Sequence, residues 1–255
     1  MKIVAVANQK GGVGKTTTAV NLCAALHELG RRVLLLDCDP QGNATSGMGV
    51  AKTRRPGAYE LLRGEADAED CVVHTAWGDL IPAGKELAAA SVELIGRERR
   101  EFVLKDALAG VFDLYDYALI DCPPSLELLT VNALAAADSV LVPMQCEYYA
   151  LEGLADLMTS IRLCARRLNR RLTIEGLVLT MYDARMNLTQ QVENELRSHL
   201  GEKVYQTVIP RSVRLSEAPS HGQPGVCYDK NNRGSKAYRA LAEEFCARAE
   251  GKHGR

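Results

Sequence analysis

Short runs of consecutive apolar residues alternate along the chain with longer segments in which apolar residues recur every three or four positions. Such runs indicate strands that are buried on both faces, and the longer segments indicate amphipathic helices. The predicted strands cover residues 3–7, 32–37, 117–121, 139–143 and 174–180. The predicted helices begin with one that carries Val20 to Leu29 and continue at about 97–110, 125–137, 151–169, 188–200 and 234–249. The alternation predicts an α/β fold with a mostly parallel, twisted sheet and helices on both faces.

Glycine and proline mark boundaries between these elements. Gly30 follows the first helix and is a typical C-terminal stop. Residues 40–58 carry several glycines and prolines and are expected to form a loop. Pro123 and Pro124 exclude a helix directly after the third strand, and Ser125 is expected to cap the helix that follows.

Composition narrows the class of protein. The chain has 255 residues and a formal net charge of -1, so we expect one domain over residues 1–255, with a flexible tail after about 249, and no global attraction to nucleic acid. The eight cysteines include no Cys-x-x-Cys pair, which disfavours zinc and iron–sulfur sites and favours reduced thiols in a cytoplasmic protein. No apolar stretch is long enough to span a bilayer, and we expect no signal peptide.

The candidate chemistry lies between the first strand and the first helix, where residues 8–18 read Asn-Gln-Lys-Gly-Gly-Val-Gly-Lys-Thr-Thr-Thr. Glycines let backbone N–H groups close around phosphate oxygens, and the helix N-terminus adds positive potential. Lys15 can reach the β- and γ-phosphates, and the Thr16 hydroxyl can bind Mg²⁺. The arrangement predicts a P-loop NTPase-like fold that binds ATP with Mg²⁺. The predicted phosphate contacts are Lys10, Gly11, Gly12, Val13, Gly14, Lys15, Thr16 and Thr17.

One position departs from the strict phosphate-loop pattern. Gln9 stands where the pattern has glycine, and an additional lysine, Lys10, follows it. Lys10 could be a solvated surface charge. The alternative is a lysine that offsets the charge of a second triphosphate, as an arginine finger does.

Three carboxylates follow predicted strands: Asp37 and Asp39 after the second, and Asp121 after the third. Ligands bind at the carboxyl ends of parallel strands, although a lone acid there is equally well a helix cap or a turn residue. Beside a phosphate loop, Asp121 is expected to take part in holding Mg²⁺, as the Walker B acid does.

The chain resembles the ParA/Soj-type partition ATPases of the deviant Walker A (MinD/ParA) class over nearly its whole length. The matching segments are residues 8–18, 37–47 (DCDPQGNATSG), 121–132 (DCPPSLELLTVN), 143–154 (PMQCEYYALEGL) and 208–222 (VIPRSVRLSEAPSHG). The resemblance implies a homodimer formed around ATP, non-specific binding of double-stranded DNA by that dimer, and slow ATP hydrolysis that a ParB/Spo0J-like partner stimulates. It also implies nucleoid association and a role in segregating a chromosome or plasmid.

The resemblance also implies roles for particular residues. Lys10 would reach the partner's nucleotide, and Asp39 would orient the attacking water, which makes Lys10, Lys15 and Asp39 the candidate catalytic residues. Thr16, Asp37 and Asp121 are the candidate metal residues, with a structural role left open for Asp37. Met181 and Pro210 would enclose the adenine. Arg185 and Arg214 would contact DNA, as would Arg211 unless it lies at the adenine.

Two further interpretations concern charge and membranes. The pairs Arg166–Arg167 and Arg170–Arg171 end a predicted helix, where cations interact favourably with the helix dipole, so a structural role is expected.

The alternative function is that of a MinD-like, membrane-associated positioning ATPase, which needs an amphipathic C-terminal helix with bulky apolar residues. The last residues lack them, and the stripe of Tyr238, Leu241 and Phe245 is expected to pack on the core, so we expect no stable membrane association.

Overall fold

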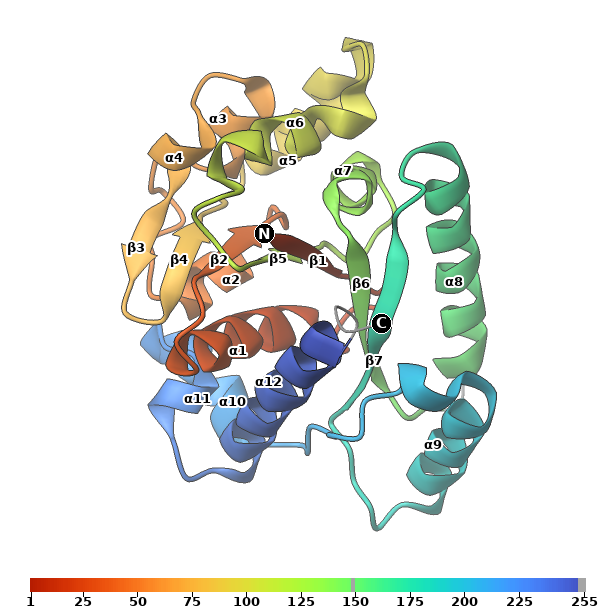
Figure 1. The fold of residues 1–255 in the computed structure, drawn as a ribbon. Helices are drawn as coiled ribbons and strands as arrows, with labels where there is room; N and C mark the ends of the chain where they lie inside the picture. The colour runs from red at the N-terminus through yellow and green to blue at the C-terminus, as the bar shows by residue number, and fades with distance from the viewer. Residues whose placement is uncertain (148–149, 252–255) are drawn as a thin grey trace.

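A computed structural model describes residues 1–147 and 150–251 and shows one sheet with helices on both faces (Figure 1). Within these residues the sheet has seven strands in the order β3-β4-β2-β5-β1-β6-β7, and only β3 is antiparallel to its neighbour. The strands are β1 (Lys2–Val6), β2 (Val33–Asp37), β3 (Val73–Thr75), β4 (Gly78–Ile81), β5 (Tyr117–Asp121), β6 (Ser139–Gln145) and β7 (Thr173–Thr180). The five central parallel strands confirm the predicted fold class.

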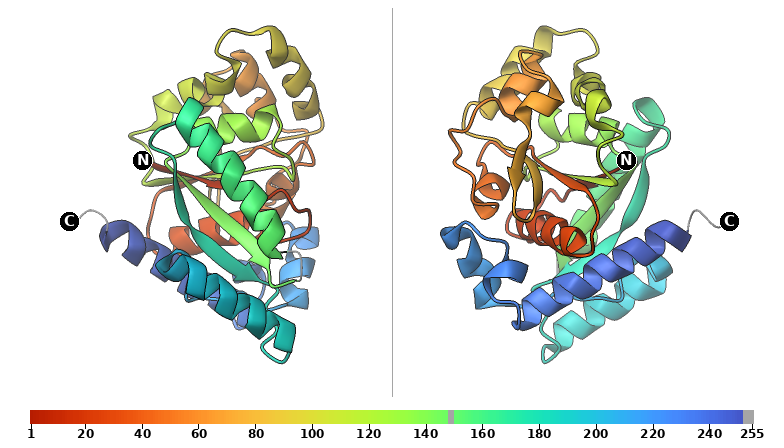
Figure 2. Two further views of the ribbon diagram at one scale, coloured as in Figure 1. Left: turned by 90° about the vertical axis from the view of Figure 1, so that its right-hand side faces the viewer. Right: turned by 60° about the vertical axis from the view of Figure 1, so that its left-hand side comes forward.

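The helices divide between two hydrophobic clusters, one on each face of the sheet. On one face α1 (Lys15–Glu28) and α12 (Arg233–Gly251) lie side by side (Figure 2), close to α10 (Val213–Glu217) and α11 (Gly225–Tyr228). The other face is covered by α3 (Ala58–Arg63), α4 (Ala68–Cys71), α5 (Leu87–Glu93), α6 (Val103–Ala107), α7 (Leu128–Ala136), α8 (Ala150–Arg167) and α9 (Asn187–Leu200). A short helix, α2 (Asn43–Gly47), follows β2.

Several sequence predictions of detail are wrong. The segment expected as one helix at 97–110 is helical only from Arg100, because Arg99 adopts a left-handed conformation with φ 54°, and 3₁₀ turns flank α6 on both sides. The expected loop at 40–58 contains α2. Ser125 does not cap a helix: α7 begins at Leu128, and the Ser125 carbonyl accepts a bond from the Thr130 hydroxyl at 2.6 Å. Strands β3 and β4 were not predicted, since three or four residues are too few to show a period.

Two other predictions concern the cysteines and the C-terminus. All eight cysteines are free, and all but Cys227 are buried, as expected. The last helix continues to Gly251, two residues past the predicted start of a flexible tail. Tyr148, Tyr149 and residues 252–255 lie outside the described residues, so the expectation for the end of the tail stays a prediction.

The parallel strands bring the predicted site residues to one edge of the sheet. Asp121 pairs in register with Asp37 of β2 and with Val6 of β1, after which the glycine loop begins. The carboxyl ends of three adjacent strands therefore meet beside the N-terminus of α1. This edge is where a parallel α/β sheet places its ligands.

Candidate nucleotide site

The glycine loop forms an open turn between β1 and α1. Gly12 has φ 75° and Gly14 has φ 88°, conformations that residues with a side chain rarely adopt. The first turn of α1 has no side-chain cap, so its N–H groups are left to bind a ligand. Two side chains brace the loop from behind. The Thr180 hydroxyl donates to the Val13 carbonyl at 2.7 Å, and Gln145 Nε2 donates to the Gly12 carbonyl at 3.0 Å. The loop is thus held in a shape suited to polyphosphate.

Lys15 begins α1 and turns back across the loop. Its side chain is buried, and Nζ donates to the Lys10 carbonyl at 3.0 Å. Burial lowers the pKa of Lys15, while the Asp121 carboxylate acts in the opposite direction. A buried ammonium with one carbonyl partner gains most from an anionic ligand, because a charge-assisted bond to phosphate is stronger.

Lys10 points outward rather than into its own loop. Its Nζ forms an ion pair with Glu147, which follows β6, and both side chains are about half exposed. The amine is therefore accessible at the surface of the protomer. An exposed ion pair of this kind contributes little stability, so Lys10 can exchange Glu147 for another anion at small cost.

Asp121 is the most unusual group at this edge. Its residue is fully buried, and neither carboxylate oxygen accepts a hydrogen bond of normal geometry from a described residue. Burial and then the Asp37 carboxylate raise the pKa of Asp121 well above its ordinary value, whereas Thr16 and Lys15 lower it. Buried carboxylates are normally paired or bound to metal, so this one fits a nearby cation.

Asp37 lies beside Asp121 in a different environment. Its Oδ2 accepts bonds from the Thr45 backbone N–H at 2.8 Å and the Thr45 hydroxyl at 2.7 Å, and its Oδ1 accepts the Asp39 N–H at 3.2 Å. Burial raises the pKa of Asp37 to about 6, and the bonds from Thr45 oppose the rise. These bonds tie α2 to β2. Of the two roles that the sequence left open for Asp37, metal binding and structural support, they favour structural support.

Asp39 stands at the start of the segment that leads into α2. Its Oδ1 accepts the Gln41 N–H at 2.9 Å, and the residue is 8% exposed. Its second oxygen has no bond of its own within the described residues. That oxygen is open to a hydrogen bond from water, and the role predicted for Asp39 in orienting the attacking water stays a prediction.

A Mg²⁺ ion would find few protein ligands here. Among the described residues, no three His, Cys, Asp or Glu side chains converge as a metal site. Mg²⁺ bound with a nucleotide needs only one or two protein oxygens, since phosphates and waters complete its shell. The Thr16 hydroxyl and the unpartnered Asp121 carboxylate meet that need, so the residues present fit the ion.

A cavity of about 160 Å³ continues the site past Thr17. Met181 and Pro210, the two residues predicted to enclose the adenine, line it, and their contact with the adenine stays a prediction. Arg211 lines it as well, which keeps its alternative role at the adenine open.

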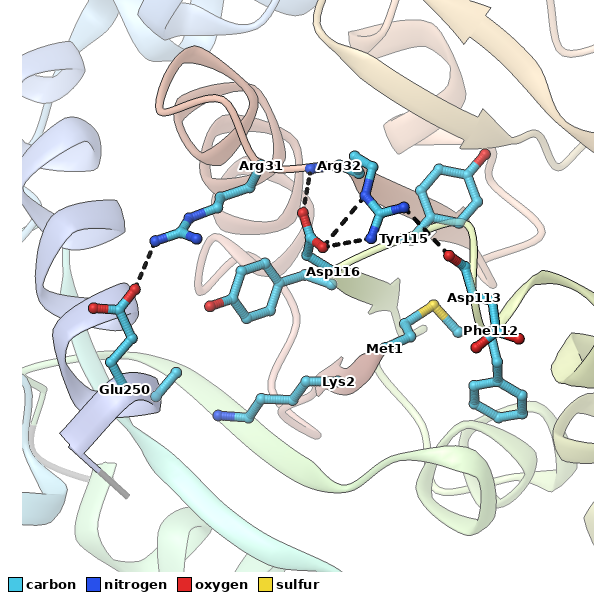
Figure 3. Close-up of a pocket in the computed structure, with 11 residues that line it drawn as sticks. Met1, Lys2, Arg31, Arg32, Phe112, Asp113, Tyr115, Asp116 and Glu250 are labelled. Atoms are coloured by element: carbon cyan, nitrogen blue, oxygen red, sulfur yellow. Dashed lines mark hydrogen bonds and ion pairs between the residues drawn. The ribbon is translucent and has the colours of Figure 1, made fainter. Parts of the chain in front are cut away.

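A larger cavity of about 610 Å³ lies at the opposite edge of the sheet. There Arg32 pairs with Asp116 and Arg31 with Glu250 (Figure 3).

Of the three predicted DNA contacts, Arg185 and Arg214 do not line this cavity, whereas Arg211 does. Arg185 forms two bonds to Asp183, of 2.9 and 2.7 Å, and Arg214 pairs with Glu217 at 2.9 Å. Arg185, with a smaller effect from Arg211, lowers the pKa of Asp183 to about 2. The loop after β7 and the segment before α10 therefore lie together, joined by the bond from the Tyr182 N–H to the Ile209 carbonyl at 2.9 Å.

Sequence reasoning missed three residues of this site. Glu147 and Gln145 lie in the segment 143–154, which resembles the ParA/Soj-type proteins. The sequence did not predict that either residue contacts the phosphate loop. Thr180 ends a buried strand, which is the signal that identified Asp121, but a threonine at a strand end is too common to single out.

The glycine loop with its two lysines, faced by buried strand-end carboxylates, defines a P-loop ATPase of the deviant Walker A class. A family model described as "AAA domain" matches residues 1–174. The chain is 55% identical over 249 residues to the sporulation initiation inhibitor protein Soj of Bacillus subtilis, covering 96% of this chain and 98% of that protein. It is 53% identical to the chromosome-partitioning ATPase Soj of Thermus thermophilus, covering 97% and 96%. The chain belongs to the ParA/Soj family of chromosome-partitioning ATPases, which confirms the resemblance.

The fold is also shared with solved structures. Cobyrinic acid a,c-diamide synthase from Mycobacterium smegmatis, with bound ADP and magnesium, is 37% identical to this chain and has a TM-score of 0.84. The match covers 95% of this chain and 93% of that one. In the part of the chain that the structure describes, no helix is long and apolar enough to cross a membrane.

Asp121 provides a stability prediction. We expect Asp121→Asn to raise the free energy of unfolding of the ligand-free protein by about 1–3 kcal/mol at pH 8, because it removes a buried carboxylate that accepts no hydrogen bond of normal geometry from a described residue. The folded protein favours the protonated acid, so stability falls as pH rises above the ordinary pKa of 3.8. The gain should therefore be smaller at pH 5. Urea unfolding of the wild type and of Asp121→Asn at both pH values measures the gain. A variant that is less stable than the wild type at pH 8 would contradict the prediction.

Proposed function

We propose that this chain is an ATP-dependent switch that forms a homodimer around two MgATP molecules, binds double-stranded DNA in that state and releases it after slow hydrolysis. The observation that carries the proposal is the buried Asp121 carboxylate, unpartnered among the described residues, beside the Lys15 ammonium and an open phosphate loop. Lys15 binds the β- and γ-phosphates, Thr16 binds Mg²⁺, and Asp121 holds the ion's water shell.

Lys10 supports the dimeric form. In one protomer its amine reaches outward to Glu147 instead of inward to the loop. Two triphosphates held face to face repel each other, and a lysine from each protomer offsets the charge of the partner's nucleotide. In this account Lys10 leaves Glu147 when the two protomers meet.

Asp39 supports slow hydrolysis and its stimulation. Its bond to the Gln41 N–H fixes one oxygen in the segment that leads to α2. We propose that a ParB/Spo0J-like partner shifts this segment, so that Asp39 orients the attacking water. A base placed by a partner-dependent movement gives low intrinsic turnover.

The DNA surface is assigned to Arg185 and Arg214, and Arg211, which lines the cavity beside Met181 and Pro210, keeps both the DNA and the adenine assignment. Because the net charge is -1, binding must come from a local surface. Two more exposed cations without an ion pair among the described residues, Arg233 and Lys236, begin α12. The bond of 2.8 Å between Ser212 and Asn232 places them beside Arg211. Arginine forks bind phosphates without reading bases, which fits binding without sequence preference and association with the nucleoid.

The MinD-like alternative has less support. Tyr238, Leu241 and Phe245 are buried against α1 and the sheet, as the sequence predicted, so the apolar stripe of α12 has no free face for a lipid surface. Retention of the protein on immobilised duplex with ADP, ATP and a non-hydrolysable analogue, at two salt concentrations, tests the proposal. We expect retention only with the triphosphates and a steep loss with salt. ATP-dependent pelleting with anionic vesicles, and no retention on DNA, would favour the alternative.

The arginine assignment leads to a prediction. We expect Arg185→Ala with Arg214→Ala to reduce retention on duplex at least tenfold, about 1.4 kcal/mol, while ATP-dependent dimerisation is unchanged. Their carboxylate partners do not prevent this role, since exposed ion pairs contribute little and exchange readily with phosphate. Arg63→Ala with Arg99→Ala removes two other exposed, paired arginines and serves as the control. Retention of the first variant equal to that of the control would refute the assignment.

A further inference from the structure

A second basic surface lies at the N-terminal end of β7, opposite the end from which the chain leads to Arg185. Five arginines lie within the ten positions 162–171, just before the start of β7, and we name them the arginine row: Arg162, Arg166, Arg167, Arg170 and Arg171. The first three lie on the last turns of α8, and the other two lie in the turn to β7. All five are exposed, and no side chain of the row forms an ion pair or hydrogen bond with another residue that the structure describes. Arg185 and Arg214, by contrast, are each paired with a carboxylate.

The helix dipole explains only part of this row. The favourable effect of a cation is confined to the last turn of a helix, which contains Arg166 and Arg167. Arg162 lies more than one turn before the C-terminal end of α8, and Arg170 lies beyond that end. Arg162 and Arg166 are four positions apart on the outward side of α8, where like charges repel. The row therefore costs some stability, and no carboxylate of the described residues offsets it.

The chemistry of the row fits a polyphosphate backbone. Residues four apart on a helix are about 6 Å from each other, so successive guanidinium groups can contact successive phosphates. The outward positions offer little apolar surface, since Leu163, which is 55% exposed, is the one large hydrophobic residue among them. The buried centre of a protein–protein interface is usually more apolar than its rim, whereas binding to a nucleic-acid backbone depends mainly on positive charge.

The row is well separated from the surface of Arg211 and Arg214. The turn from α8 to β7 lies at the upper right of Figure 1, and the loop that leaves the other end of β7 lies at the bottom. The eight residues of β7 span about 26 Å. We infer that the arginine row is a second contact for duplex DNA, and that the ATP-bound protein joins two duplex segments. This inference rests on the proposed function and adds a second site to it.

Capture of one duplex by another tests the inference. Immobilised duplex is loaded with the full chain and a non-hydrolysable ATP analogue, and a fluorescent duplex is then added. We expect the triple variant Arg166→Gln, Arg167→Gln and Arg170→Gln to capture about tenfold less fluorescent duplex than the wild type, while its own retention changes less than about twofold. The matched control, Arg63→Gln, Arg99→Gln and Lys105→Gln, removes the same charge from exposed positions in α3, before α6 and in α6, and should behave as the wild type. The corresponding triple change to lysine keeps the charge and should retain capture.

Each other outcome counts against the inference. Equal capture by the triple glutamine variant and the wild type would overturn it, as would a wild type that is retained but captures no second duplex. A wild type that is not retained on DNA at all would refute the proposed function, and the second site with it. Loss of binding to anionic vesicles by the variant, with capture unchanged, would show that the row faces a membrane instead.

Discussion

Replacing Lys15 with alanine is expected to lower the affinity for ATP about 100-fold, since charge-assisted bonds contribute about 1.5–3 kcal/mol each. The side chain is 7% exposed, and its ammonium is held at the mouth of the loop by a single carbonyl at 3.0 Å. A triphosphate replaces that carbonyl with a stronger, charged partner. Burial lowers the pKa of Lys15, and the nearby Asp121 and Asp39 carboxylates oppose that fall.

Isothermal titration calorimetry with ATP and Mg²⁺ measures this effect. The fold should persist, because Lys15 is the first residue of α1 and alanine is the most favourable helix residue. Lys105→Ala, an exposed lysine on α6, is the control and should bind ATP as the wild type does. An affinity of Lys15→Ala within about threefold of the wild type, in a protein with unchanged unfolding, would contradict the assigned contact.

Replacing Asp39 with alanine is expected to reduce ATP hydrolysis about 10²- to 10⁴-fold while the nucleotide still binds. Asp39 bonds to the Gln41 N–H at 2.9 Å and to no residue of the phosphate loop. Its loss therefore removes the group that orients water and leaves Lys15, Thr16 and the glycines in place. Phosphate release measures the rate, and fluorescence of a labelled nucleotide measures the binding.

Asp39→Asn separates chemistry from structure at the same position. The amide oxygen still accepts the Gln41 N–H, but the side chain is a far weaker base. If the assignment is right, both variants lose hydrolysis to the same order. Near-normal turnover by Asp39→Asn would instead mean that the residue only shapes the segment before α2.

The fold was predictable where burial leaves a simple pattern. The central strands, such as β2 and β5, are buried on both faces, so their consecutive apolar residues identify them. Strands β3 and β4 lie at the margin and are too short for a pattern. The helix expected at 97–110 starts only after Arg99, whose left-handed backbone no local signal announces.

The site was predictable where chemistry follows the chain direction. Strand ends located Asp37 and Asp121, and the loop motif located Lys15 and Thr16. The sequence could not assign Asp37 between two roles, because the deciding bonds come from Thr45, on a helix that was expected to be loop. Nor could it show that Glu147 holds Lys10, since the two are 137 positions apart and meet only through the order of the strands.

The central claim is that ATP joins two copies of this chain, and sedimentation velocity of the Asp39→Ala protein tests it most directly. We expect a dimer with ATP and Mg²⁺, a monomer with ADP, and a weakened dimer when Lys10→Ala is added although ATP still binds. A protein that binds ATP yet sediments as a monomer at every concentration would contradict the account.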